Sequence, residues 1–503
     1  MKVNNQQHET YDEIQGSFSL EDDENQINCQ RYSIEEIPTN QLSGDEAIEK
    51  SFMQSIGKSS ILNSKTQKTS IPLTAVIIMK SMVGVGILGV PYVTSNFGGI
   101  LTTLILIIIF CIGILSSILL LKCKNLSRRS NISTIGFFVF KHKWIVIVIN
   151  LIIISSNLGV CLSELIIFGD TCSNLVNYFS GQNSTEQPIY LSRPLLIIIA
   201  SVVLFPFLIV KQIEKLKFVS LFALLSIGMF TCSVVYNYFL IEKKNDTFTW
   251  WLPENFSIIR AMASMPTLIL AFCWQFNLFP IYKGMTKITD RNLIISTILG
   301  FVMGSILYLL VGILGFATYG IKIEPNYLLS INDSDVGGPL FVLLNLSFVL
   351  STTLTIPLMF FAGRNNFIQL IKQLQNNKTK ILSKNRKNLL ENQNKDLDYN
   401  TIVNLKKKSQ AIRFYGISII LFLMITVEAI FLRNLGIVYN LLGSITCNAI
   451  QLGLPTLFYI FLAKQVKRMK FRNIQNRIFY YLVCLLLLLS IFLTFFCVTS
   501  EFV

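Results

Sequence analysis

The sequence predicts an all-α polytopic membrane protein with eleven transmembrane helices. Two observations support this fold class. Of the 503 residues, 52% are hydrophobic and only 14% are charged, which is too apolar for a soluble protein of this length. The apolar residues also gather into separate runs, most of them about 20 residues long, which is the length that crosses a bilayer. Buried helices of a soluble core rarely reach this length, so we expect a lipid bilayer around the chain.

The eleven spans follow from these runs in chain order. Eight contain long stretches without Asp, Glu, Lys or Arg, and the other three are shorter or carry a charge. The predicted spans lie near residues 72–92, 99–121, 144–168, 194–210, 218–241, 261–282, 293–320, 338–362, 414–432, 436–463 and 478–499. Together they form a membrane domain over residues 71–500.

Two polar segments lie outside the spans. Residues 1–70 contain twelve Asp or Glu and six Lys or Arg, with too little apolar surface to offset the entropy cost of ordering. We therefore expect a disordered acidic tail there. Residues 364–411 are rich in Asn, Lys and Gln, and we expect a flexible basic loop.

The distribution of Lys and Arg predicts the orientation. With the N-terminus in the cytosol, the cytosolic connections hold 36 of these residues and the outside connections hold 6. By the positive-inside rule, the tail and the 364–411 loop are then cytosolic. The net charge of +15 is explained by this topology and predicts no nucleic-acid partner. The sequence does not choose between the plasma membrane and a vacuolar or lysosomal membrane.

The first span carries three glycines and a proline: Gly84, Gly86, Gly89 and Pro91. Each glycine weakens a helix by up to about 1 kcal/mol relative to alanine, so we expect a break near Gly84–Ile87. The carbonyls that end the first half-helix would attract a cation, and the N–H groups that start the second would attract an anion. The alternative is close packing of helices through small residues.

The sixth span, 261–282, shows a second interruption. It contains Pro266, Pro280 and the polar insertion "FCWQFNLFPIY". Paired broken helices are typical of secondary transporters built from inverted repeats. Trp274 and Gln275 occupy the presumed break, where they either line a binding site or pack at an interface.

Two charges fall inside predicted spans. Lys80 precedes Gly84 by four residues, about 6 Å along a helix, so its ammonium could reach the carbonyls at the break. Otherwise it extends to the cytosolic interface. Glu164 lies in the third span, and an intramembrane carboxylate indicates a functional residue by default. The alternative is that Glu164 lies near the outer mouth of the protein.

No arrangement typical of an enzyme accompanies these charges. There is no Ser-His-Asp set, phosphate-binding loop or metal-ligand spacing, and the ten cysteines are scattered. The sequence therefore predicts no catalytic residue, no metal and no cofactor beyond a coupling ion.

Several motifs in order resemble the amino acid/auxin permease family. They are "GVGILGVPY", "SNLGVCLSELIIFGDT", "FPFLIVKQIEKLKFVSLFALLSI", "FCWQFNLFPIY", "TTLTIPLMFFAGRNNF" and "NLGIVYNLLGSITCNAIQLGLPTLFY". The resemblance covers nearly everything from Leu73 to Ala463 and implies a LeuT-type 5+5 inverted repeat plus one extra helix. Glu164 stands where members of the family more often have an aromatic residue.

The break and the resemblance together indicate site residues. From the break, the substrate carboxylate would bind backbone N–H groups around Gly86, Ile87 and Leu88, with Gly84 and Val85 completing the substrate site. Thr353 and Thr355 of the eighth span would face that break, where sodium-coupled relatives use a threonine hydroxyl as a cation ligand. Thr353 is the better match, although either threonine could simply bond to its own helix.

The predicted function is secondary active transport of amino acids by alternating access. Lysine at position 80 is similar to proton-coupled members of the family, which favours a proton as the coupling ion. The alternatives are a sodium-coupled transporter and an amino-acid-sensing receptor on the same fold. A channel is disfavoured because the spans do not repeat around a pore. The expected partners are the amino acid and the lipid bilayer, and the sequence indicates no protein partner.

Overall fold

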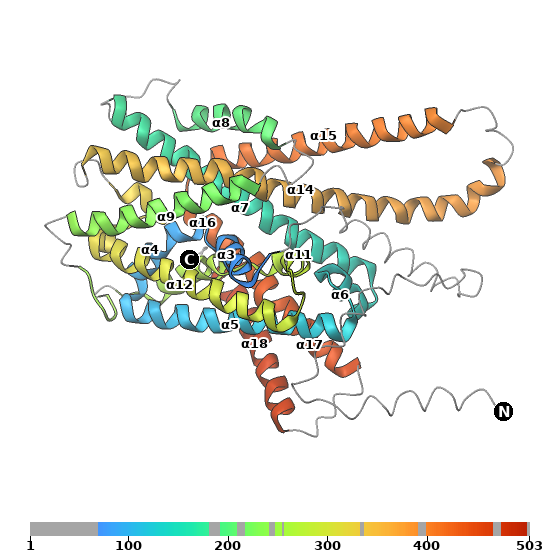
Figure 1. The fold of residues 1–503 in the computed structure, drawn as a ribbon, viewed down its shortest axis with the longest axis horizontal. Helices are drawn as coiled ribbons and strands as arrows, with labels where there is room; N and C mark the ends of the chain where they lie inside the picture. Colours follow the sequence, from blue (N-terminus) through green and yellow to red (C-terminus); the bar gives the residue numbers. More distant parts are fainter. Residues whose placement is uncertain are drawn as a thin grey trace. The chain divides into compact units, whose positions relative to one another are not determined.

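The computed structural model describes residues 69–180, 192–208, 217–240, 247–253, 256–331, 337–390, 399–465 and 474–499. The regular elements of these residues are helices (Figure 1), joined by one isolated β-bridge between Thr69 and Met285. The prediction of an all-α protein is therefore confirmed for the described part of the chain. The predicted acidic tail lies outside the described residues, except for Thr69 and Ser70.

The helices follow the apolar runs of the sequence. The first half of the chain forms α3 Ile71–Met82, α4 Gly86–Phe97, α5 Gly99–Ser127, α6 Ile132–Phe140, α7 Lys143–Ser180, α8 Arg193–Leu208 and α9 Lys217–Leu240. The sixth to eighth predicted spans correspond to α10 Ile258–Ala271, η6 Gln275–Asn277, α11 Leu278–Gly284, α12 Asp290–Tyr319, η7 Gly320–Lys322, η8 Tyr327–Ser330 and α14 Gly338–Leu390. The remainder forms α15 Tyr399–Phe431, α16 Leu435–Leu441, η9 Leu442–Cys447, η10 Ala449–Gly453, α17 Leu454–Gln465 and α18 Ile474–Thr499.

Eight helical segments of the described residues are long and apolar enough to cross a membrane, and the bent pair α3–α4 makes a ninth. The predicted spans at 194–210 and 218–241 correspond to shorter apolar helices, Arg193–Leu208 and Leu224–Leu240. The count of eleven spans therefore stays a prediction.

Both predicted interruptions are present. The helix of the first span ends at Met82 and resumes at Gly86, with a bend of 65° between α3 and α4. In the sixth span, α10 ends at Ala271, and Phe272–Trp274 precede the short turn η6. The backbone thus leaves the α-helical path in both spans that an inverted repeat would pair.

The segment 364–411 differs from its prediction as a loop. Helix α14 continues to Leu390 and α15 begins at Tyr399, so most of this segment is helical. The physical reason is that residues 364–411 contain no Gly or Pro, while their many Leu, Ile, Lys and Gln residues tolerate a helix well. A further helix, α6, lies in the predicted connection 122–143.

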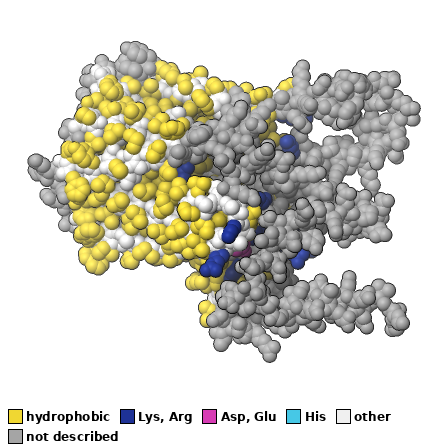
Figure 2. Space-filling view, viewed as in Figure 1, with side chains coloured by type: hydrophobic (Ala, Val, Ile, Leu, Met, Phe, Trp, Pro, Cys, Tyr) yellow, Lys and Arg dark blue, Asp and Glu magenta, His cyan; other side chains and the backbone are white. Residues whose placement is uncertain are grey.

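Long helices surround the two broken spans. Helix α12 packs against α3 and α4, while α14 packs against α7 and α9. The outer faces of α8, α9 and α18 expose Val202, Phe239 and Leu488. Figure 2 shows hydrophobic side chains over most of the visible described surface, with Lys and Arg side chains near one edge of it. This surface matches a chain whose solvent is the interior of a bilayer.

Candidate functional site

The first break leaves a row of free backbone donors. The N–H groups of Gly84, Val85 and Gly86 have no acceptor among the described residues, whereas those of Ile87 and Leu88 donate to Gly84 O and Val85 O, at 3.3 Å each. The break was predicted correctly, but its free amides begin two residues earlier than the predicted carboxylate site at Gly86–Leu88. Three successive free amides at the N-terminus of α4 form a site with positive electrostatic potential.

Gly86 allows the two breaks to approach each other closely. A Cβ on Gly86 would lie 3.0 Å from Cα and Cβ of Ala271, the last residue of α10. At Gly84 the nearest atom to such a Cβ is Glu164 Oε1, at 4.0 Å. The first break therefore contacts the second on one side and a buried carboxylate on the other.

A small cavity of about 40 Å³ lies at the first break. It is lined from α3, α7, α9, α14 and the regions of both breaks. The lining residues are Lys80, Ser81, Met82, Val83, Gly84, Val85, Gly86, Ser156, Val160, Glu164, Ile227, Leu270, Cys273, Phe276, Thr355, Met359 and Cys447. The structure thus brings Lys80 and the free amides of the first span together with Glu164 of the third span and Thr355 of the eighth.

The two charges of this cavity attract each other without a direct contact. Glu164 is buried, with 2% of its surface exposed, and Lys80 is half-buried. Their opposite charges interact across the cavity, but no N–O distance within 4 Å joins them. Neither side chain has a hydrogen-bond partner among the residues that the structure describes. A buried charge without a close partner is costly, so this pair is poised to accept a proton or a charged ligand.

The second break is closed by its own side chains. The backbone N–H of Trp274 donates to Gln275 Oε1 at 3.0 Å, and the Trp274 ring packs edge-on against Phe301. Both Trp274 and Gln275 are fully buried and neither lines the cavity, which Cys273 and Phe276 line instead. The structure therefore does not bring the two predicted residues to the site.

Two tyrosines hold the broken ends and were missed from the sequence. Tyr308 of α12 donates its hydroxyl to Ala271 O at 2.7 Å and also lies 3.0 Å from Met82 O, so one group serves the C-terminal ends of α3 and α10. Tyr439 of α16 donates to Val85 O at 2.6 Å. Both are fully buried. The available signal was a tyrosine in the middle of an apolar span, where a hydroxyl needs an acceptor.

The two threonines of α14 occupy different places. Thr355 lines the cavity and bonds to Ser351 O, whereas Thr353 bonds to Val349 O and does not line it. Both hydroxyls donate to carbonyls of their own helix. The structure therefore places Thr355, rather than the expected Thr353, beside the first break.

The two ends of the broken spans are tied in different ways. At the Thr69 end, Thr69 N–H donates to Gly284 O and Thr286 N–H donates to Thr69 O, each at 2.9 Å, which joins the start of α3 to the end of α11. At the opposite end, Ile100 N–H donates to Trp250 O at 2.9 Å. We call this second end the Arg260 end, because Arg260 lies there in the exposed first turn of α10.

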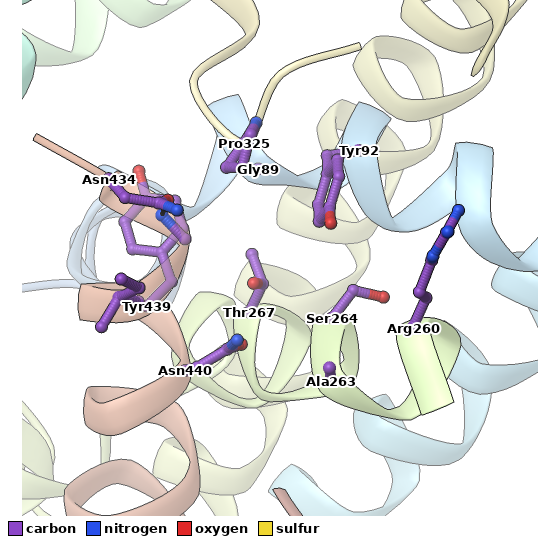
Figure 3. A pocket seen from close by; sticks show the side chains of 12 residues that line it. Gly89, Tyr92, Arg260, Ala263, Ser264, Thr267, Pro325, Asn434, Tyr439 and Asn440 are labelled. Carbon is purple, nitrogen blue, oxygen red and sulfur yellow. Dashed lines mark hydrogen bonds between the residues drawn. The ribbon is translucent and has the colours of Figure 1, made fainter. Parts of the chain in front are cut away.

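A larger cavity of about 210 Å³ lies at the Arg260 end (Figure 3). Its lining residues are Gly89, Tyr92, Arg260, Ala263, Ser264, Thr267, Pro325, Asn434, Gly436, Ile437, Tyr439 and Asn440. Tyr439 lines this cavity and also bonds to Val85 O beside the small one, so its side chain reaches from one cavity to the other. No sequence pattern predicted this cavity, and Arg260 lies just before the predicted sixth span.

The family follows from comparison with known proteins. A family model described as transmembrane amino acid transporter protein matches residues 67–499. The chain belongs to this family. Its members among the similar proteins are transporters, not enzymes. The fold is similar to that of Mhp1, a nucleobase-cation-symport-1 family transporter solved in a closed conformation with bromovinylhydantoin bound (TM-score 0.51, 13% identity, 87% of this chain and 94% of that chain). At this identity the likeness shows a LeuT-like fold alone.

Curated relatives align with part of this chain. The vacuolar amino acid transporter 7 of Saccharomyces cerevisiae is 24% identical over 271 residues, which cover 52% of this chain and 51% of the relative. The sodium-coupled neutral amino acid transporter 7 of Bos taurus is 23% identical over 293 residues, 57% of this chain and 62% of the relative. The alignments thus span between half and two thirds of these relatives.

Proposed function

We propose that this transporter moves amino acids across a membrane by secondary active transport coupled to protons. The observation that carries the proposal is the cavity at the first break, where three free amides, Lys80 and Glu164 meet. An amino acid carries a carboxylate, and this cavity offers positive backbone donors for it beside Glu164, a group that can take up or release a proton. Membership of the amino acid transporter family supports the substrate class.

The free amides of Gly84, Val85 and Gly86 bind the substrate carboxylate in this proposal. Glu164 Oε1 lies close to Gly84, so an ionised Glu164 would repel a second carboxylate at the same donors. Substrate binding is therefore favoured when Glu164 carries a proton. The proton and the amino acid then cross together because each stabilises the other in the cavity.

Lys80 supplies a fixed positive charge in the last turn of α3. The carbonyls that end a helix carry the negative end of its dipole, and a cation nearby offsets it. Lys80 would take this role, which a sodium ion would have in a sodium-coupled transporter. Thr355 bonds to its own helix beside this position and serves as a polar wall of the cavity.

Alternating access would work through the two cavities. Tyr439 separates them by its hydrogen bond to Val85 O, so breaking that bond would join the central cavity to the Arg260 end. Breaks in the first and sixth spans support a 5+5 inverted repeat with α18 as the added helix. The excess of Lys and Arg in alternate connections supports a cytosolic N-terminus, which puts the Thr69 end on the cytosolic side.

The test is uptake of radiolabelled amino acids by purified protein in sealed vesicles. We expect saturable uptake that an imposed pH gradient drives and that is unchanged when choline replaces sodium. Lys80→Ala should lose the response to the pH gradient, and Lys80→Asn should gain sensitivity to sodium. Binding without turnover would indicate a receptor, and uptake that requires sodium would refute proton coupling.

A further inference from the structure

We propose that the cavity at the Arg260 end is a separate binding site for the carboxylate of an amino acid. It would hold the substrate before the Tyr439 barrier opens to the central cavity. Only this order of events rests on the proposed function; the site itself requires no transport. Its chemistry follows from which polar groups line it and which of them are unused.

Three hydrogen-bond donors of this cavity are unused. The guanidinium of Arg260, the hydroxyl of Tyr92 and the hydroxyl of Thr267 have no hydrogen-bond partner within the described part of the chain. The lining includes neither Asp nor Glu, so the positive charge of Arg260 is not neutralised there. A cavity with one cation and further hydroxyl donors selects an anion, and a guanidinium matches the two oxygens of a carboxylate.

The backbone holds these donors on facing helices. Arg260, Ser264 and Thr267 follow each other at intervals of four and three residues, which places them on one face of α10. Figure 3 shows that this face lies toward Tyr92 and Gly89 of α4. A Cβ on Gly89 would lie 3.0 Å from the Tyr439 ring and still closer to the Thr267 methyl group. Glycine at this position thus lets α4, α10 and α16 meet at the inner end of the cavity.

The cavity changes in character from its mouth to its inner end. Arg260 is exposed at the start of α10, whereas Thr267 and Tyr439 are buried. Tyr439 then contacts Val85, one residue from the free amide of Gly86. A carboxylate held at Arg260 would therefore have Thr267 ahead of it and, beyond Tyr439, the amides of the first break. The site thus selects for a carboxylate at the mouth.

Protection of an introduced cysteine tests the site directly. Ala263 lines the cavity and is partly exposed, so the Ala263→Cys variant should react with the neutral reagent N-ethylmaleimide. The unaltered protein gives the background from its own cysteines, of which Cys111 and Cys232 are exposed among the described residues. The probes are L-alanine, propionate, which lacks the amine, ethylamine, which lacks the carboxylate, and inorganic phosphate.

We expect L-alanine and propionate to slow the modification and ethylamine and phosphate to leave it unchanged. Adding Arg260→Gln should raise the concentration of propionate that protects the cysteine at least about tenfold, because the charge-assisted pair between arginine and carboxylate is lost. With Arg260→Lys in its place, part of the protection should return. Arg433→Gln is the matched control, since Arg433 is an exposed arginine at the same end that does not line the cavity. It should leave protection unchanged.

Several results would overturn the carboxylate site. They are equal protection by ethylamine, equal protection by phosphate, or protection that Arg260→Gln does not weaken. The outcome is independent of the proposed function. Protection by propionate in a protein that shows no uptake would support the carboxylate site and refute transport. Proton-driven uptake without protection would support transport and refute the carboxylate site.

Discussion

The two broken spans differ in how their backbone groups are satisfied. At the first break the glycines leave three N–H groups free, and these face a cavity with Lys80 and Glu164. At the second break there is no glycine, and Gln275 accepts the hydrogen bond from Trp274 while the Trp274 ring packs on Phe301. The first break thus leaves backbone donors beside a cavity, whereas at the second break a side chain accepts the hydrogen bond of the Trp274 backbone.

The comparison also shows what keeps both breaks together. Tyr308 bonds to the last carbonyl of α10 and lies near that of α3, and Gly86 contacts Ala271 closely. The first break therefore has free N–H groups on the side of the cavity, and on its other side it is packed tightly against the second break. Each of the following variants alters the first break, the second break, the hydroxyl that bonds to both, or the wall of the cavity.

The largest effect is expected for Gly86→Leu. A side chain there would overlap Ala271, whose Cα lies 3.0 Å from the position of a Cβ, and would displace the second break. We expect uptake to fall below detection while the protein still reaches the membrane. Gly416→Leu is the matched control, because nothing lies within 4 Å of a Cβ at that position of α15. Uptake at the normal rate by Gly86→Leu would contradict the role of the first break.

A smaller effect is expected for Tyr308→Phe. The change removes one hydroxyl from two buried carbonyls, and each unsatisfied buried group costs about 1–3 kcal/mol. We expect a lower midpoint of thermal unfolding together with an uptake rate about tenfold lower, the size of a 1.4 kcal/mol change. Tyr481→Phe on the exposed face of α18 should change neither quantity. Unchanged uptake in Tyr308→Phe would show that the two breaks are not held through this hydroxyl.

Gln275→Met separates stability from substrate binding. In this variant the buried backbone N–H of Trp274 loses its acceptor, so the midpoint of thermal unfolding should fall. Because Gln275 does not line the cavity, the amino acid concentration for half-maximal uptake should stay within about twofold of its original value, less than the change that 1.4 kcal/mol of lost binding produces. A large rise in that concentration with an unchanged melting curve would mean that Gln275 binds substrate after all.

The smallest effect distinguishes the two threonines of α14. Thr355→Val removes a hydroxyl from the cavity wall, whereas Thr353→Val removes one that lies outside it. We expect Thr355→Val to raise the half-maximal concentration by a few fold and Thr353→Val to leave it unchanged. The reverse order of effects would favour the placement that the sequence suggested.

The positions of the breaks could be predicted because they depend on local chemistry. Gly84, Gly86 and Pro91 weaken a helix wherever it lies, so the interruption of the first span was visible in the sequence. The intramembrane charges Lys80 and Glu164 were found for a similar reason, since each is costly in lipid without a partner. Local composition thus predicted the position of the break and identified Lys80 and Glu164 as intramembrane charges.

The rotation of each helix could not be predicted in the same way. Whether Thr353 or Thr355 faces the cavity depends on how α14 packs against α7 and α9, and two neighbouring threonines give no periodic signal. Trp274 and Gln275 were placed in the site because they lie at the break, but their side chains turn to close it. Tyr308 and Tyr439 act over long sequence separations, which local patterns do not record.

The most direct test of the central role of the first break is a measurement of proton movement. A pH-sensitive dye sealed in vesicles reports whether adding a transported amino acid, in choline buffer without a starting pH gradient, acidifies the interior. We predict acidification by the unaltered protein and by Glu428→Gln, an exposed carboxylate of α15. Glu164→Gln should exchange labelled amino acid without acidification, and acidification of normal size in that variant would contradict Glu164 as the group that carries the proton.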